Sequence, residues 1–188
     1  MKSKKILTSI LICLSLLMLS NLQAKEPIKF GKVSVEELQM TQCAYDSTAP
    51  AIVLCDYGEF NPTAFTFYRI LRIKILNKEG LDMASQVFSG NDIQGIRGKT
   101  YNLVNDKIES EKLSNESIFK ERVTEDRYRY RIAMPNVKVG SVFEICYTLK
   151  GLPDVWKFQW KVPAQWSELY LPPSENVNFR KNFSGMYS

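Results

Sequence analysis

The side chains that could carry chemistry in this chain are four cysteines and several carboxylates, and no histidine accompanies them. Without histidine the Ser-His and Cys-His nucleophile pairs, the commonest zinc ligand and the usual neutral-pH proton shuttle are excluded. A cysteine nucleophile would need another base or a cationic pocket to lower its pKa. The sequence supplies neither beside Cys43, Cys55 or Cys146. We therefore predict no catalytic residue, no cofactor, no metal site and no enzymatic activity.

Two pairs of carboxylates are close in sequence, Asp56 with Glu59 and Glu125 with Asp126. Two carboxyl groups that face one substrate act as general acid and base in glycoside hydrolysis. Both pairs lie where the pattern predicts turns and strand ends, and solvated carboxylates are common there. We expect these side chains to be solvated rather than catalytic.

Three cysteines lie beyond the N-terminal segment that contains Cys13. In an oxidising compartment Cys43 and Cys55, which a short polar connection separates, are candidates for a disulfide. Spacing alone does not show that their Cβ atoms meet. The alternative is that Cys43, Cys55 and Cys146 are small buried thiols.

Arg127, Arg129 and Arg131 alternate with two tyrosines. This composition suits stacking on a sugar or a nucleobase. The simpler interpretation is a strand whose tyrosines face the core while the arginines face water, where charged rows also discourage edge-to-edge pairing. The three arginines are kept as a candidate surface for an anionic partner.

A cluster of aromatic residues occupies the C-terminal part of the chain. Trp156, Phe158 and Trp160 alternate with polar residues as far as Val162, which predicts a half-buried strand with aromatic side chains in the core. Trp166 lies outside this alternation. It is the candidate for an exposed aromatic platform that binds a glycan or peptide.

The first 24 residues have the organisation of a secretory signal peptide. Three lysines precede an apolar run from Ile6 to Leu19, which is too short to span a bilayer, and Ala24 suits the cleavage position. Cleavage removes three lysines from a formal net charge of +5 and leaves +2. This small charge gives no support to a nucleic-acid partner. The alternative is an uncleaved segment, the one expected route to a membrane.

The pattern in the rest of the chain predicts short strands separated by polar turns. Ser34 and Glu37 form a capping box, which predicts one short helix from Val35 to Met40. The strand spacing predicts an all-β, mainly antiparallel fold, a β-sandwich or related two-sheet architecture. We expect one domain over residues 25–179 and a frayed end over residues 180–188. The main predicted strands are residues 51–54, 65–76, 83–88, 100–104, 107–113, 117–123, 128–134, 142–149 and 156–162.

Pairing can be predicted for some of these strands. Residues 100–113 contain an Asn-Asp turn and are expected to form a hairpin. Residues 83–88 are expected to pair with residues 65–76. Residues 142–149 alternate strongly, which predicts one packed face and places Glu144 on the other.

Several sequence blocks, in order along the chain, resemble those of one known domain family. The blocks at residues 72–80 and 135–141 carry most of this resemblance. The other blocks are residues 30–34 with 36–38, 51–57, 100–103 and 156–163. Together they resemble the family called domain of unknown function 3857, over about Phe30 to Phe179. The resemblance implies a β-rich, non-catalytic module between a signal peptide and a transglutaminase-like domain, typically in Gram-negative envelope proteins.

The chain departs from that pattern, because no Cys, His and Asp positions of a transglutaminase-like core follow. No catalytic residue can be carried over. The first hypothesis is therefore an exported interaction or scaffolding module of the periplasm or outer envelope, which docks against a transglutaminase-like or other envelope protein. The alternative is a free-standing module that binds a glycan or peptide.

Overall fold

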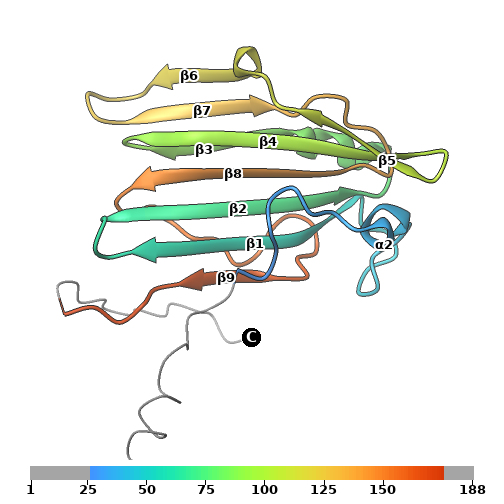
Figure 1. Cartoon of the computed structure of the whole chain (residues 1–188), viewed down its shortest axis with the longest axis horizontal. Helices are drawn as coiled ribbons and strands as arrows, with labels where there is room; N and C mark the ends of the chain where they lie inside the picture. The colour runs from blue at the N-terminus through green and yellow to red at the C-terminus, as the bar shows by residue number, and fades with distance from the viewer. Residues whose placement is uncertain (1–25, 176–188) are drawn as a thin grey trace, which may run out of the picture.

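The chain forms two β-sheets, seen in the computed structural model of Figure 1, which describes residues 26–175. The predicted signal peptide at 1–24 and the frayed end at 180–188 lie outside the described residues. No helix of the described part is long and apolar enough to cross a membrane. The elements are α2 (Val35–Gln39), β1 (Ala51–Asn61), β2 (Thr66–Ile75), the 3-10 helix η1 (Lys78–Ala84), β3 (Ser85–Gly90), β4 (Ile93–Val104), β5 (Lys107–Lys112), the 3-10 helix η2 (Asn115–Ser117), β6 (Ile118–Arg122), β7 (Tyr128–Ala133), β8 (Val142–Lys150) and β9 (Ser167–Tyr170).

The larger sheet has the strand order β5-β4-β8-β2-β1-β9. All its neighbours are antiparallel except β1 and β9, which run parallel. The predicted hairpin over residues 100–113 is confirmed as β4 and β5. Its turn residues Asn105 and Asp106 have φ angles of 49° and 59°. Positive φ at both positions matches the right-handed twist of the flanking strands, and Asn and Asp tolerate it.

The smaller sheet has the order β3-β7-β6. The expectation that residues 83–88 pair with residues 65–76 is wrong, because η1 intervenes. The Asn77 side chain caps η1 by accepting from the Gly80 amide at 3.3 Å, and the chain then leaves the larger sheet. As a result β3 pairs with β7 in the second sheet.

The main core lies between the two sheets. Phe67 and Leu71 of β2 and Phe143 and Ile145 of β8 are buried in one cluster with Ile132 of β7. The predicted all-β, two-sheet architecture is therefore confirmed.

The outer face of the larger sheet is also covered. The alternation of residues 142–149 predicted only one packed face, but both faces of β8 are buried. The N-terminal part of the described chain supplies the cover, with Leu38 of α2 packed in a second cluster with Val142. Helix α2 confirms the capping box, since the Ser34 hydroxyl accepts from the Glu37 amide at 3.2 Å and the Glu37 carboxylate accepts from the Ser34 amide at 2.7 Å.

The predicted strand over residues 156–162 is wrong: this segment is an irregular connection between β8 and β9. It is held by side chains instead of a strand ladder. Trp156 packs edge-on against Phe67 with ring centroids 5.8 Å apart. A Cβ at Gly58 would lie 2.7 Å from the Trp156 ring, so glycine makes this approach possible. Phe158, expected in the core, is 57% exposed.

Candidate functional site

Strand β2 carries cationic side chains on both of its faces. Side chains alternate along a strand, so Arg69 points to the inner face while Arg72 and Lys74 point to the outer face. Each face holds a network of polar contacts. We call them the inner network (Asp56, Arg69, Tyr147 and Trp160) and the outer network (Lys29, Gly31, Glu37, Arg72, Tyr101 and Glu144).

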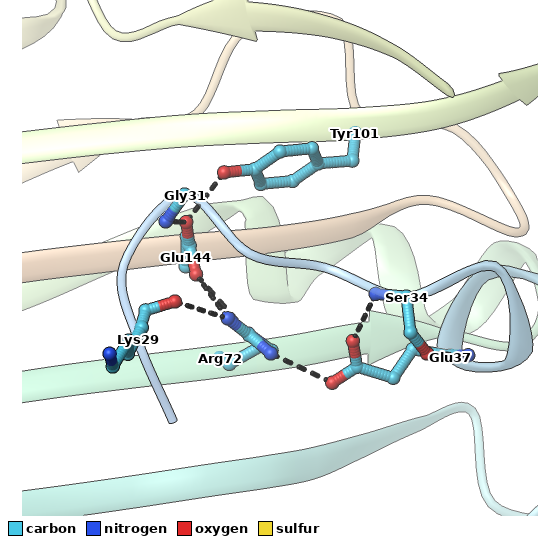
Figure 2. A network of polar contacts seen from close by, with 7 residues as sticks. All are labelled: Lys29, Gly31, Ser34, Glu37, Arg72, Tyr101 and Glu144. Atoms are coloured by element: carbon cyan, nitrogen blue, oxygen red, sulfur yellow. Dashed lines mark hydrogen bonds and ion pairs between the residues drawn. The ribbon is translucent and has the colours of Figure 1, made fainter. Parts of the chain in front are cut away.

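Glu144 is the centre of the outer network (Figure 2). Its Oε2 pairs with Arg72 Nη2 at 2.8 Å, and its Oε1 accepts from the Tyr101 hydroxyl at 2.6 Å and from the Gly31 amide at 2.5 Å. Arg72 also donates to Glu37 Oε1 at 2.9 Å and to the Lys29 carbonyl at 3.0 Å. The network joins three strands to the N-terminal segment.

The outer network holds the fold together and offers no open position to a ligand. The side chains of Arg72 and Glu144 are 3% and 0% exposed, and both carboxylate oxygens of Glu144 have partners. Burial, followed by the hydrogen bond to Glu144, raises the pKa of Tyr101 and keeps its hydroxyl a donor. The network therefore fixes the N-terminal segment on the sheet.

Lys74 lies beside this network, fully buried and without a carboxylate partner in the described chain. Its Nζ donates to the carbonyls of Leu38 and Gly140, both at 2.6 Å. Burial lowers its pKa from 10.5 to about 8. A neutral amine still has two N–H groups, one for each carbonyl, so loss of the charge keeps both bonds.

This lowered pKa predicts a pH dependence. Below pH 8 both folded and unfolded chains hold the Lys74 proton, and folding bears the cost of burying the charge. Between pH 8 and 10.5 only the unfolded chain keeps the proton, so stability rises with pH. We expect the free energy of unfolding of the natural chain, measured in urea and taken relative to that of Lys74→Met, to rise by about 2 kcal/mol over that range.

Comparison with Lys74→Met removes the contributions of other titrating groups, which both proteins share. Lys78→Met is the matched control, because Lys78 is exposed. Its difference from the natural chain should stay constant with pH. A constant difference for Lys74→Met as well would contradict the prediction.

The inner network lies at the floor of a groove. Asp56 is buried and receives two bonds from Arg69, from Nε to Oδ1 and from Nη2 to Oδ2, both at 2.8 Å. Trp160 Nε1 donates to the same carboxylate at 3.1 Å. The Arg69 guanidinium lies 4.8 Å from the Trp156 ring centroid and 5.5 Å from that of Phe88. These contacts hold a cation and several aromatic rings in fixed positions.

The groove itself has a volume of about 810 Å³ and lies between β3 and residues 153–161. We call it the β3 groove. Val87 and Ser89 of β3 form one wall, and residues 153–161 form the other. Arg127, Lys157 and Lys161 are the other cations that line it, besides Arg69 on the floor. It combines aromatic surface with positive charge.

The structure separates the residues predicted as one binding surface. Arg127 lines the β3 groove and pairs with Asp154. Arg129 and Arg131 lie 3.7 and 3.9 Å from Glu121 on β6 and do not line the groove.

Trp166 lies in a different hollow of about 310 Å³, against the N-terminal segment. The expectation that this side chain is exposed holds: it is 48% exposed, and its Nε1 donates to Glu168 at 3.0 Å.

The cysteines and carboxylates also differ in part from expectation. Cys43 and Cys55 are free thiols in separate hydrophobic clusters, so the candidate disulfide is absent from the structure. The alternative, that Cys43, Cys55 and Cys146 are small buried thiols, is confirmed. Burial raises the pKa of Cys55 to about 12. The expectation that Asp56 is solvated is wrong, because its partner Arg69 lies on the adjacent strand. Glu59 accepts from the Tyr57 hydroxyl at 3.0 Å.

Glu125 and Asp126 are exposed, as expected. No group of three or more metal-ligating side chains is placed to hold a metal ion within residues 26–175.

Sequence reasoning missed the floor of the β3 groove. Arg69 was part of a predicted strand, and Trp160 was assigned to a core strand. The available signal was a cation within an apolar strand, since a charge at such a position requires a partner. Asp56 at the end of an apolar run was that partner.

No family model and no curated protein matches this chain. Among the solved structures that match the chain is a crystal structure described as a "putative protease" from Parabacteroides distasonis, at 8% identity and a TM-score of 0.43. The match covers 55% of this chain and 23% of that one. The matched part of this chain thus corresponds to less than a quarter of that protein, and a likeness this distant carries no argument about function.

Proposed function

We propose that this chain is an exported, non-catalytic β-sandwich module whose function is to bind another macromolecule in the β3 groove. One observation carries the proposal: the inner network holds Arg69 among aromatic rings at the floor of an 810 Å³ groove. Ligand sites in proteins are concave, are lined by aromatic side chains with a few fixed polar groups, and have volumes similar to that of this groove. Groups that are already fixed lose little entropy on binding.

The sequence supports the class of partner and the location. The N-terminal segment supports export to the periplasm or outer envelope, and the resemblance to domain of unknown function 3857 supports a transglutaminase-like or other envelope protein as partner. Interaction or scaffolding is then the role of the module.

A free-standing glycan- or peptide-binding role is the second candidate, favoured by the exposure of Trp166. This side chain borders a hollow that also contains Glu36, Glu37 and Gln165. An exposed indole beside polar side chains suits stacking on a sugar ring. The two candidates therefore place the ligand at different positions on the molecule.

A photo-crosslinking residue tests the proposal in the cells that make the protein. It replaces Val87 in the β3 groove, Gln165 beside Trp166, or Ile108 on β5 as control. Val87 and Ile108 are a matched pair, exposed apolar residues on edge strands at 50% and 40% exposure. We expect a discrete adduct in the envelope fraction from position 87 alone.

The other outcomes separate the candidates. An adduct from position 165 alone would move the binding surface to the Trp166 hollow. Adducts that are the same at positions 87 and 108, or none at 87 and 165, would overturn the proposal of a binding module.

A further inference from the structure

Strand β3 presents free backbone hydrogen-bonding groups to the β3 groove. The Met134 amide donates to the Ala84 carbonyl at 2.9 Å, so residues 84 and 134 form a hydrogen-bonded pair. Such pairs alternate along an antiparallel ladder. The register then directs the backbone groups of Gln86 and Phe88 toward β7 and those of Val87 and Ser89 away from it.

No strand of the described chain occupies that other side, because β3 is at the edge of its sheet. Val87 and Ser89 are exposed and line the groove. Their N–H and C=O groups therefore form a template on which a further strand can pair.

Strand β3 also lacks the protection that the other edges have. Natural edge strands are kept from pairing by charged side chains or proline. The other edge strands of the two sheets, β5, β6 and β9, each carry at least one charged residue. Strand β3, with the sequence Ser-Gln-Val-Phe-Ser-Gly, carries neither a charge nor a proline. Within residues 26–175 this is the edge that is left open to pairing.

The groove has room for an added strand. A strand occupies about 4.8 Å in the hydrogen-bonding direction, about 10 Å across the layer and about 3.4 Å per residue, or roughly 160 Å³ per residue. The groove volume of 810 Å³ then holds roughly five residues. This matches the length of β3, which has 6 residues.

The charge of the groove selects the ligand. Arg69, Arg127, Lys157 and Lys161 line it, against the single carboxylate of Asp154. Arg69 and Arg127 are neutralised by Asp56 and Asp154. Within residues 26–175 no carboxylate pairs with Lys157 or Lys161, and both lysines are exposed. The wall opposite β3 therefore attracts negative charge.

We propose that the β3 groove binds an extended acidic peptide segment of a partner protein, which adds to β3 as a further strand. Its backbone bonds to Val87 and Ser89, its apolar side chains pack on Phe88 and Trp160, and its carboxylates face the two lysines. Strand addition takes its affinity from main-chain bonds and its specificity from pockets for alternate side chains. This inference rests on the proposed function and names the ligand class for the same groove.

The test uses the purified full chain and blocked peptides of the length of β3. The probe alternates valine with glutamate, and we expect it to bind in isothermal titration calorimetry, more weakly as salt is added. Three comparison ligands are expected to bind at least about tenfold more weakly. They are a valine–lysine peptide, the acidic peptide with alternate backbone nitrogens methylated, and a β-1,4-linked glucose hexamer.

Two proline substitutions provide a matched pair of variants. Ser89→Pro removes an amide that faces the groove. Lys120→Pro removes an amide of β6, at the other edge of the same sheet. The Val123 amide donates to the Arg127 carbonyl, so residues 123 and 127 form a hydrogen-bonded pair. By the same alternation the Lys120 amide faces away from β7. Proline is tolerated at such positions because the N–H bonds no neighbour. We expect Ser89→Pro to weaken probe binding by about tenfold or more and Lys120→Pro to leave it within about twofold.

A charge variant and hydrogen exchange complete the design. Lys157→Glu combined with Lys161→Glu should reverse the preference, so that the valine–lysine peptide binds better than the acidic one. In the natural chain the probe should slow exchange of the Val87 and Ser89 amides. That measurement decides the case if Ser89→Pro does not fold.

Each failure has a distinct meaning. If Ser89→Pro leaves probe binding unchanged and the probe does not protect the Val87 and Ser89 amides from exchange, strand addition would be overturned. Binding in the groove would then remain supported. Preference for the basic peptide or the glucose hexamer would overturn the acidic-peptide assignment. No probe binding together with an adduct at position 87 in cells would overturn this inference and leave the proposed function intact, whereas absence of both results overturns both.

Discussion

Replacement of Glu144 by alanine is expected to lower the free energy of unfolding by about 3–5 kcal/mol, the range for breaking a buried ion pair from one side. The substitution leaves the Arg72 guanidinium buried beside an empty space. It also leaves the Tyr101 hydroxyl and the Gly31 amide without their acceptor. Urea unfolding followed by circular dichroism measures the loss.

Two variants show whether the loss comes from removing the buried counter-ion of Arg72, which then keeps only the partly exposed Glu37 as its carboxylate partner. Glu109→Ala removes an exposed glutamate on β5 and should change stability by less than about 0.5 kcal/mol. Replacing both partners, Arg72→Met with Glu144→Leu, should recover the part of the loss that comes from the buried Arg72 charge, while the Tyr101 hydroxyl and the Gly31 amide still lack their acceptor. A single Glu144→Ala variant as stable as Glu109→Ala would show that the outer network does not hold the N-terminal segment.

Replacement of Asp56 by alanine is expected to cost about 3 kcal/mol and to disorder the floor of the β3 groove. Arg69, whose side chain is 17% exposed, loses its counter-ion. Trp160 loses the acceptor of its indole N–H. Unfolding gives the stability, and a shift in tryptophan emission reports the change around Trp156 and Trp160, the two of the three tryptophans that contact Arg69.

Glu59→Ala is the control for this substitution, because Glu59 lies on the same strand and contacts Tyr57 instead of the groove. It should shift the emission little. If Asp56→Ala and Glu59→Ala had equal effects on stability and emission, the inner network would not organise the groove.

Features of the fold that depend on nearby residues could be predicted from the sequence. The β4–β5 hairpin follows from an Asn-Asp turn, and α2 follows from Ser34 and Glu37, so each signal lies within a few residues. The pairing of β3 with β7 could not be predicted, because the paired residues lie 38 to 48 positions apart along the chain. The alternation in residues 156–162 predicted a strand that does not form, because alternation describes side chains and does not specify backbone pairing.

The same difference between local signals and contacts of distant strands explains which parts of the candidate site could be predicted. Arg127 was predicted as a surface residue and does line the groove, but Trp166 lies in another hollow. Asp56 and Glu144 were expected on polar positions, yet both are buried because cations on β2 neutralise them. Their partners become neighbours only when the strands pair.

The parallel pairing of β1 and β9 has a consequence for the timing of folding. One wall of the β3 groove, residues 153–161, follows β8 and is fastened to β1 at its C-terminal end, by the bond from Val53 to Pro163 and by β9. Strand β1 precedes β9 by about a hundred residues, so this contact closes a long loop, and such contacts form slowly. We therefore expect the groove to be completed late, after β1 and β2 have paired. For the proposed function this order means that the surface assigned to the ligand is expected to be complete only when the whole chain has folded.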